Sequence, residues 1–449
     1  MATKKDLIEA QGFSRRRLLS AFTGGAPGGK ELEPAQPLRA VVAGIALTAL
    51  LVLGGVFYGL VRPGLPTGWE NNHLILASDT GARYISVKSV LYPVINTASA
   101  RLLVPANKFA VITTDQKTLG GIKIGPTVGI LGAPDHLPAA DQLITAGWSA
   151  CVAGDGTTAV ALPTGRLLDA TPTAAVVSSG GTLYVIAGEL RYEVDSAAAG
   201  PVLRAVGLDT ASAVAVDGNW LNLFQPGITL KPIVVAKAGQ QVGSTGLAVG
   251  TVVHPRGAPT TERYLITSDG QLATLGTLAY QLYLLGTGAN ASGDHDVSPA
   301  DIASLPTSKT AAGGSDWPVS TLTATAAGTP TCALLTHTNG APHTLLGVLT
   351  STAKLPSTTA GVRVASGRGA LVSAGGAGSQ GSGMVYVIDE SGTAYPVPGA
   401  NAEVIARLGY TTSEVMKVPE GWINFMPIGP ALTEQAAGAS PKATSSAAP

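Results

Sequence analysis

The amino-acid sequence predicts a mainly β chain with short helices, of the α+β class, that carries one membrane-spanning helix near its N-terminus. Three observations predict this class: many glycines and prolines, one long uncharged apolar run, and an internal repeat. Because 57 Gly and 30 Pro interrupt most long helices, the composition favours short strands joined by turns. A single core stops growing at roughly 250–300 residues, so 449 residues are expected to form more than one packing unit.

The charge of the chain is balanced overall but uneven along its length. The 28 Lys and Arg equal the 28 Asp and Glu, which gives no indication of a nucleic-acid partner. Residues 1–39 are locally basic, because seven Lys or Arg there outnumber four Asp or Glu. We predict that residues 1–39 form a cytoplasmic basic segment.

The membrane-spanning helix is predicted at residues 40–61, a run of 22 residues without a charge. At about 1.5 Å per residue such a helix is about 33 Å long, enough for a hydrocarbon core of about 30 Å. A buried core helix is the alternative, but soluble helices rarely stay uncharged on every face over about six turns.

The basic residues predict the orientation of this helix. Seven Lys or Arg precede it, whereas Arg62 is the single one within the 20 residues that follow. Positive residues favour the cytoplasmic side, so the N-terminus is expected inside and residues 62–430 outside the cell membrane. A cleaved twin-arginine signal at 14–19 is the alternative, but its arginines lie far from an apolar run that is too long for such a signal.

The two cysteines, Cys151 and Cys332, both fall on the predicted outer side. An exterior location is oxidising, so a Cys151–Cys332 disulfide is the natural hypothesis. It would close a loop of about 180 residues, which contributes roughly 5 kcal/mol in the chain-entropy model. Two independent buried thiols are the alternative.

An internal repeat organises the outer region. The tripeptide Tyr-Val-Ile at 184–186 recurs at 386–388, a displacement of 202 residues, and 220–224 matches 422–426 at the same displacement. Related Ser-Asp-Gly hairpin patterns occur near the beginning of the region and near residue 268. We therefore predict four repeats around a central β-rich body, at residues 70–104, 181–230, 260–290 and 383–430. Residues 431–449 are rich in Ala, Ser, Thr and Pro and are predicted to be disordered.

Trp220 and Trp422 occupy matching positions in two of these repeats. Exposed tryptophans can act as ligand platforms, but the apolar neighbours of both residues favour packing in the core of each repeat.

The candidate catalytic motifs each lack a feature that their chemistry needs. Residues 24–30 fit the first seven positions of a phosphate-binding loop, but Glu31 stands where Ser or Thr must ligate Mg²⁺. The cluster 294–296 (Asp-His-Asp) is more typical of a solvated turn than of a metal site. Residues 374–383, rich in Gly, Ser and Ala, have the composition of a flexible loop. The sequence thus predicts no catalytic, cofactor-binding or metal-ligating residue and no enzyme.

Several motifs together resemble a known family. They are a basic segment at 11–19, Arg62-Pro63 after the apolar run, Leu-Tyr-Pro-Val-Ile-Asn-Thr-Ala-Ser-Ala-Arg-Leu at 91–102, Gly-Ile-Leu-Gly-Ala-Pro at 129–134 and Trp-Ser-Ala-Cys at 148–151. This pattern resembles EccB, the single-span core membrane component of actinobacterial type VII (ESX) secretion systems. The resemblance implies an elongated, propeller-like outer domain of quasi-two-fold-related repeats with one disulfide.

The resemblance also implies a function and partners. A structural subunit of the secretion complex would assemble with EccC (an FtsK-like motor ATPase), EccD, EccE and a mycosin protease, and with further copies of itself. It would export small folded substrates and have no cofactor. A membrane-anchored protein that grips the cell wall through its repeats is one alternative. An ATPase is the other, since that activity is sometimes attached to the family name.

Overall fold

The computed structural model describes residues 3–23, 37–60, 65–152, 156–163, 167–169, 173–290, 294–326, 328–349, 361–376 and 383–441. The chain divides into two compact parts, Met1–Gly64 and Leu65–Pro449.

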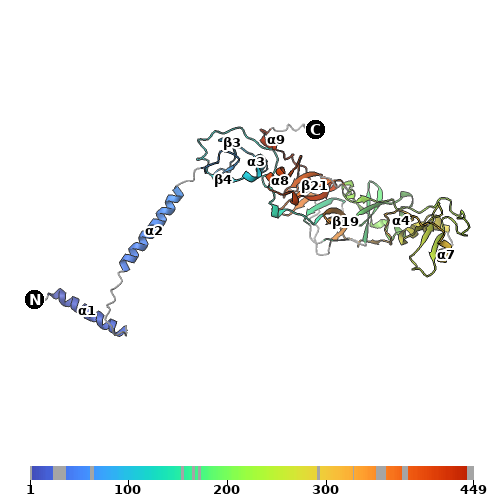
Figure 1. The fold of residues 1–449 in the computed structure, drawn as a ribbon, viewed down its shortest axis with the longest axis horizontal. Coiled ribbons are helices and arrows are strands. Elements are labelled where there is room, and N and C mark those ends of the chain that lie inside the picture. The colour runs from blue at the N-terminus through green and yellow to red at the C-terminus, as the bar shows by residue number, and fades with distance from the viewer. Residues whose placement is uncertain are drawn as a thin grey trace. The chain divides into compact units, whose positions relative to one another are not determined.

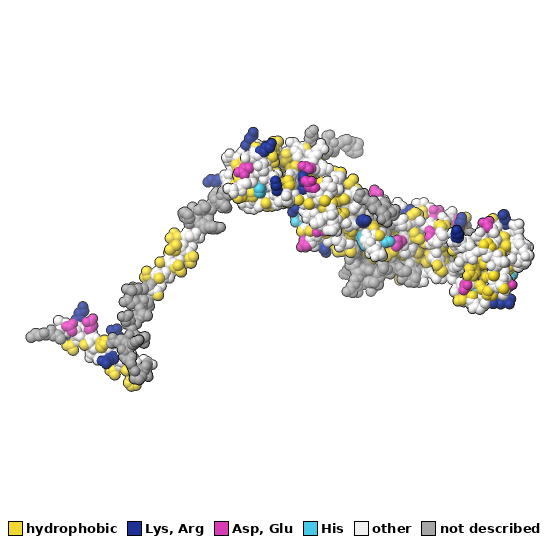
Figure 2. Space-filling view, viewed as in Figure 1, with side chains coloured by type: hydrophobic (Ala, Val, Ile, Leu, Met, Phe, Trp, Pro, Cys, Tyr) yellow, Lys and Arg dark blue, Asp and Glu magenta, His cyan; other side chains and the backbone are white. Residues whose placement is uncertain are grey.

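The N-terminal part consists of two helices, α1 (Lys4–Thr23) and α2 (Pro37–Leu60). Helix α2 begins with a proline, whose fixed φ suits a first helical position, and contains residues 40–60 of the run 40–61 that is predicted to span the membrane. Its side chains are described for residues 40–55, where apolar ones cover the surface (Figure 2). Within the portion that the structure describes, no helix combines the length and the apolar character needed to cross a membrane.

The C-terminal part contains four repeats with one shared topology. Three antiparallel strands are followed by a helix, and the fourth strand pairs parallel with the first, which gives the order 3-2-1-4 in each repeat. In repeat 2 two further short strands join this sheet. A parallel pair needs a crossover, and the helix between the third and fourth strands supplies it. We define repeat 1 as residues 74–128, repeat 2 as 173–230, repeat 3 as 252–307 and repeat 4 as 370–430.

The elements of repeats 1 and 2 are these. Repeat 1 contains β1 (Leu74–Ala77), β2 (Arg83–Val87), β3 (Val90–Pro93), α3 (Thr97–Leu103) and β4 (Val111–Thr114). Repeat 2 contains β8 (Thr173–Ser179), β9 (Thr182–Ala187), β10 (Leu190–Glu193), α4 (Ala199–Ala205), β11 (Val214–Ala215), α5 (Gly218–Leu221) and β12 (Gln225–Pro226).

Repeats 3 and 4 are built in the same way. Repeat 3 contains β13 (Val252–Pro255), β14 (Tyr264–Ile266), β15 (Leu272–Thr274), α6 (Thr277–Leu284), β16 (His295–Val297) and α7 (Pro299–Ile302), and β17 (Thr323–Ala324) then joins the sheet of repeat 2. Repeat 4 contains β21 (Ala370–Gly375), β22 (Met384–Ile388), β23 (Ala394–Val397), α8 (Ala402–Leu408), β24 (Met416–Pro419) and the 3₁₀ helix η7 (Glu420–Phe425), after which comes α9 (Glu434–Gly438).

Local sequence explains these elements. In repeat 2, Gly180 and Gly181 both have positive φ, the conformation of a two-residue hairpin turn, and join β8 to β9. In repeat 4, the Asn401 side chain accepts hydrogen bonds from the backbone N–H groups of residues 403 and 404 and so begins α8. Gly409, with φ of 99°, ends that helix in the left-handed conformation.

A tyrosine packed against a glycine recurs in three repeats. After its fourth strand the chain returns beside the third, and there Tyr192 lies against Gly227 and Tyr395 against Gly429, as Tyr92 does against Gly125. A side chain at any of these glycines would overlap the neighbouring tyrosine ring. Glycine is therefore required by close approach at these points.

Replacing Gly429 by alanine is expected to lower the free energy of unfolding by about 1–3 kcal/mol, because the new methyl group overlaps the Tyr395 ring. The matched control is Gly218→Ala, since nothing lies within 4 Å of a Cβ there. Denaturant unfolding of both variants tests this expectation, and equal stabilities would contradict it.

A six-stranded central sheet has the order β20-β6-β5-β18-β19-β7. Its strands are β5 (Trp148–Val152), β6 (Thr158–Leu162), β7 (Leu167–Asp169), β18 (Thr331–Thr338), β19 (Ala341–Leu349) and β20 (Gly361–Val364). The hairpins β5–β6 and β18–β19 meet antiparallel along β5 and β18. Strand β7 follows the hairpin β5–β6 and pairs with β19, and β20 follows the hairpin β18–β19 and pairs with β6. The two halves of the chain therefore exchange strands.

Shared cores arrange the repeats in a row. One core joins the central sheet to repeats 2 and 4, a second joins repeat 2 to repeat 3, and a third joins repeat 4 to repeat 1. The order in space is therefore 1-4-centre-2-3, as the labels α3, α8, β19, α4 and α7 show in Figure 1.

This row corrects the expectation of a propeller-like domain, because the sheets do not close on one another. Among the described residues, repeats 1 and 3 each share a core with one neighbour and lie at opposite ends of the row. A propeller needs its last blade to meet its first. The α+β class with several sheets and short helices is as predicted.

Several predicted boundaries differ from the structure. Repeats 2, 3 and 4 begin one strand earlier than the ranges 181–230, 260–290 and 383–430. Repeats 1 and 3 extend past residues 104 and 290 through their fourth strands, β4 and β16. Residues 374 and 375, predicted to lie in a loop, belong to β21, the first strand of repeat 4.

The predicted disorder of 431–449 is wrong for its first part. Residues 431–441 are ordered, contain α9 and bury Leu432 and Ala437 completely. Apolar contact with repeat 1 outweighs the polar composition there. Residues 442–449 lie outside the described residues.

Candidate functional site

The centre of the molecule contains the disulfide Cys151–Cys332, with an S–S distance of 2.13 Å. The two residues face each other across β5 and β18, where the two hairpins meet. They lie 181 residues apart in sequence, and both are buried. The disulfide thus connects the two halves of the chain at the middle of the central sheet.

Trp220 and Trp422 lie on this central sheet. The structure buries both completely, in α5 and η7. The Trp220 indole Nε1 donates to the Ala150 carbonyl oxygen in β5 at 2.9 Å, and the Trp422 Nε1 donates to Thr344 Oγ1 in β19 at 3.0 Å. Each indole therefore docks its repeat on the central sheet, and neither ring is accessible to a ligand.

The Trp220 position is held by a cap. The Asp217 carboxylate accepts a hydrogen bond from the Trp220 backbone N–H at 2.8 Å and a second from the Thr158 hydroxyl at 2.8 Å. Because Thr158 belongs to β6, the carboxylate begins α5 and connects it to the sheet at the same time.

Trp148 is a third buried tryptophan whose structural role the sequence did not reveal. It begins β5, and its ring forms an edge-to-face pair with the Trp422 ring at a centroid distance of 6.2 Å. Trp148 is not related to another tryptophan by the displacement of 202 residues. Its place in the core therefore became visible only with the pairing of β5 and β18.

The candidate motif at 294–296, which lies within the described residues, does not form a metal or catalytic site. Asp294 forms an ion pair with Arg263 and accepts a hydrogen bond from the Tyr280 hydroxyl at 2.7 Å, so its carboxylate is already engaged. His295 and Asp296 are exposed on β16. Within the described residues no three potential metal ligands come together. The loop 24–30 lies outside the described residues.

One shallow groove lies on repeat 1. Its lining residues are Gly81, Ala82, Arg83, Tyr84, Pro93, Val94, Ile95 and Thr127. The single charged side chain among them, Arg83, forms an ion pair with Asp135. The groove therefore presents no free charge from its own lining to fix a ligand.

Buried tyrosines act as hydrogen-bond donors between elements. Tyr192 donates to the Asp316 carbonyl oxygen at 2.6 Å, and Tyr410 donates to the Pro138 carbonyl oxygen at 2.7 Å. Burial raises the pKa of both phenols well above the ordinary value. Burial and the adjacent Asp389 carboxylate raise the pKa of Tyr395 to about 12.

These raised pKa values predict how stability depends on alkaline pH. The folded protein binds phenol protons more tightly than the unfolded chain, so this contribution is fully present below pH 10 and is lost as the pH rises toward 12. Thermal unfolding measured between pH 8 and pH 12 is expected to show a loss that Tyr395→Phe reduces. Identical pH profiles for the two proteins would contradict this expectation.

The C-terminal part also carries exposed apolar side chains on its surface. Among the most exposed are Val111 in repeat 1, Val234 and Val319 beside repeat 3, and Ile428 in repeat 4.

Comparison with known proteins identifies the family. The family model described as "Type VII secretion system ESX-1, transport TM domain B", for EccB proteins, matches residues 1–444. A relative named ESX-3 secretion system ATPase EccB3, from Mycolicibacterium smegmatis, is 29% identical over 438 residues, which cover 88% of this chain and 82% of the relative. The ESX-5 secretion system ATPase EccB5 of Mycobacterium marinum is 33% identical over 187 residues, 37% of this chain and 35% of that protein.

Solved structures show the same fold. A chain of the intact ESX-5 inner membrane complex matches with a TM-score of 0.67 at 22% identity, covering 99% of this chain and 96% of that one. The EccB3 dimer from the ESX-3 core complex matches with a TM-score of 0.65 at 26% identity, covering 82% and 99%. Since the family model spans almost every residue and the four-repeat fold agrees, this chain belongs to the EccB family of type VII secretion proteins.

Proposed function

We propose that this chain is a structural subunit of a type VII secretion membrane complex. The observation that carries the proposal is the fold: four repeats in a row about a disulfide-linked central sheet, on which repeats 2 and 4 dock. The likeness along 438 residues to an ESX-3 protein supports it. So does the matching chain within an intact ESX-5 inner membrane complex.

We propose further that α2 anchors the chain in the cell membrane, with residues 1–39 in the cytoplasm and residues 62–430 outside. The uncharged run 40–61 and the basic excess before it support this arrangement. The disulfide suits an oxidising exterior. Helix α1, which carries five Lys or Arg and no buried residue, is then free to contact cytoplasmic partners near anionic lipid.

The proposed partners are further copies of this chain together with EccC, EccD, EccE and a mycosin protease. One of the matched structures is an EccB3 dimer, which supports self-association. Another is a periplasmic assembly from an ESX-5 inner membrane complex, which supports an extracytoplasmic location. The exposed apolar side chains offer contact surface for such neighbours.

Deletion of the gene is expected to abolish export of small WXG-type substrates, and purification of the intact protein in mild detergent is expected to recover the other core components. Export is measured in the culture filtrate, and the co-purified proteins are identified by mass spectrometry. Normal export in the deletion strain would reject the role.

Orientation is tested by labelling single cysteines. Both native cysteines are in the disulfide, so a thiol introduced at Lys5 or Lys309 is the one reactive site in each variant. A membrane-impermeant maleimide added to whole cells is expected to label Lys309→Cys and to spare Lys5→Cys. The reverse pattern would reject the arrangement.

An ATPase is the second candidate, since the relatives carry that name. We propose instead that the chain is not an enzyme, because Glu31 replaces the residue that ligates Mg²⁺ in a phosphate-binding loop. Purified protein is expected to show either no ATP turnover or a turnover that Lys30→Ala leaves unchanged. Turnover that depends on Lys30 would overturn this part of the proposal.

A further inference from the structure

The displacement of 202 residues continues beyond the repeats themselves. Leu230, at the end of repeat 2, corresponds to Leu432, after repeat 4, and both are fully buried. Beyond each leucine the chain crosses to the outer neighbour of its repeat. The Ile233 backbone N–H donates to the Leu282 carbonyl oxygen of repeat 3, and the Gly129 N–H, just past repeat 1, donates to the Ala439 carbonyl oxygen.

The two crossings are held in different ways. Residues 228–250 lead directly into β13, so peptide bonds hold this crossing to repeat 3. Residues 431–441 reach repeat 1, which lies far earlier in the chain, and are held there by noncovalent contacts. Helix α9 packs on α3, with Leu432 and Ala437 in the core that joins repeats 1 and 4.

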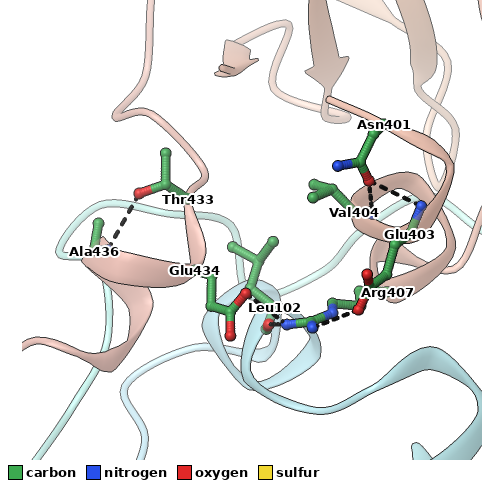
Figure 3. A network of polar contacts seen from close by, with 8 residues as sticks. All are labelled: Leu102, Asn401, Glu403, Val404, Arg407, Thr433, Glu434 and Ala436. Atoms are coloured by element: carbon green, nitrogen blue, oxygen red, sulfur yellow. Dashed lines mark hydrogen bonds and ion pairs between the residues drawn. The ribbon is translucent and has the colours of Figure 1, made fainter. Parts of the chain in front are cut away.

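Arg407 forms polar contacts with each element of this noncovalent crossing (Figure 3). Its Nη1 donates to the Leu102 carbonyl oxygen of α3 at 2.8 Å and pairs with Glu434 of α9 at 2.9 Å. Its Nη2 pairs with Glu403 of α8 at 2.7 Å. One side chain, 13% exposed, therefore joins three helices from two repeats and the C-terminal segment.

The matching position in repeat 2 carries no such group. When helices α4 and α8 are aligned through Gly207 and Gly409, Ala205 corresponds to Arg407. The junction of repeats 4 and 1, which noncovalent contacts hold, therefore has an arginine clamp. The junction of repeats 2 and 3, which peptide bonds hold, has no arginine at the matching position.

We infer that residues 431–441 are a releasable strap, clamped by Arg407, that holds repeat 1 closed on repeat 4. Releasing the strap removes α9 from the shared core and leaves repeat 1 attached through residues 129–147 and its direct contacts with α8. Without α9 this junction keeps only part of its core, the packing of α3 on α8, so repeat 1 is expected to move more widely relative to repeat 4.

The test uses the full chain with two spin labels on cysteines, measured by double electron–electron resonance. Lys117→Cys and Lys417→Cys report the junction of repeats 1 and 4, and Glu193→Cys and Asp269→Cys report the junction of repeats 2 and 3. All four side chains are exposed. Each pair is placed in the intact chain, in a chain that ends after residue 430, in a chain that ends after residue 441, and in Arg407→Met.

Ending the chain after residue 430 is expected to broaden the distance distribution of the 117–417 pair and to leave the 193–269 pair unchanged. Ending it after residue 441 is expected to change neither. Arg407→Met, which changes no residue of the strap itself, is expected to raise the open population about tenfold, since hydrogen bonds to charged groups are among the stronger ones.

Two results would overturn the inference. An unchanged 117–417 distribution after removal of residues 431–449 would show that the strap does not hold the junction. Broadening of both pairs together would show that the segment belongs to the general fold and is not a releasable element. The Arg407→Met variant guards against misfolding of the shortened chain, because it deletes no segment.

Discussion

Replacing both Cys151 and Cys332 by alanine is expected to lower the free energy of unfolding by up to about 5 kcal/mol, the largest single effect in this protein. The reason is the long stretch between them: the bond joins residues 181 positions apart and so removes many conformations from the unfolded chain. Urea unfolding of the wild type and the double variant, both under non-reducing conditions, measures the difference.

The buried position of the disulfide determines which control experiments are informative. Because the two cysteines are buried in the sheet, a mild reductant is expected to leave the folded protein intact and to act only once urea opens it. Each single variant is expected to lose about as much stability as the double variant, since either change breaks the same bond. A double variant as stable as the wild type would show that strand pairing alone holds the halves together.

Replacing Trp422 by alanine is expected to cost about 3–5 kcal/mol, because it empties a large buried site between repeat 4 and the central sheet. The change also removes the hydrogen bond to Thr344 and leaves the Trp148 ring without its neighbour. Denaturant unfolding monitored by far-UV circular dichroism measures the loss. In cells, the same variant is expected to accumulate poorly and to reduce export.

Two further variants define this effect. Trp422→Phe keeps most of the ring volume and is expected to lose much less stability than Trp422→Ala. Val234→Ala changes a side chain that is 79% exposed and is expected to remain within about 0.5 kcal/mol of the wild type. If Trp422→Ala behaved like Val234→Ala, the docking role of the indole would be wrong.

The repeat was visible in the sequence where the repeats share bulky residues and was missed where they do not. The second strands of repeats 2 and 4 share Tyr-Val-Ile, so the predicted ranges began at these strands. The first strands, Thr173–Ser179 and Ala370–Gly375, share Ala-x-Val-Ser at 175–178 and 370–373, but there the displacement is 195 residues and not 202, so the period of the repeat did not reveal them. Their place in the sheet depends on pairing with the strands beside them, which composition does not reveal.

The strap shows the same limit for a functional element. Residues 431–441 have the composition of a disordered tail, yet Leu432 and Ala437 are fully buried against residues from the other end of the chain. The sequence did not single out Arg407 as a candidate functional residue either. An arginine that follows a glutamate by four residues in a helix usually forms an ordinary surface ion pair. The signal available in the sequence was the match between Leu230 and Leu432 at 202 residues.

The sequence by itself determined the features that depend on local composition: the apolar run 40–61, the basic segment before it, the period of the repeat and the family resemblance. Tertiary structure alone decided that the repeats lie in the order 1-4-centre-2-3, that the cysteines face each other across β5 and β18, and that the C-terminal segment returns to repeat 1. These arrangements depend on strand register and on cores shared by residues hundreds of positions apart, so no local pattern encodes them.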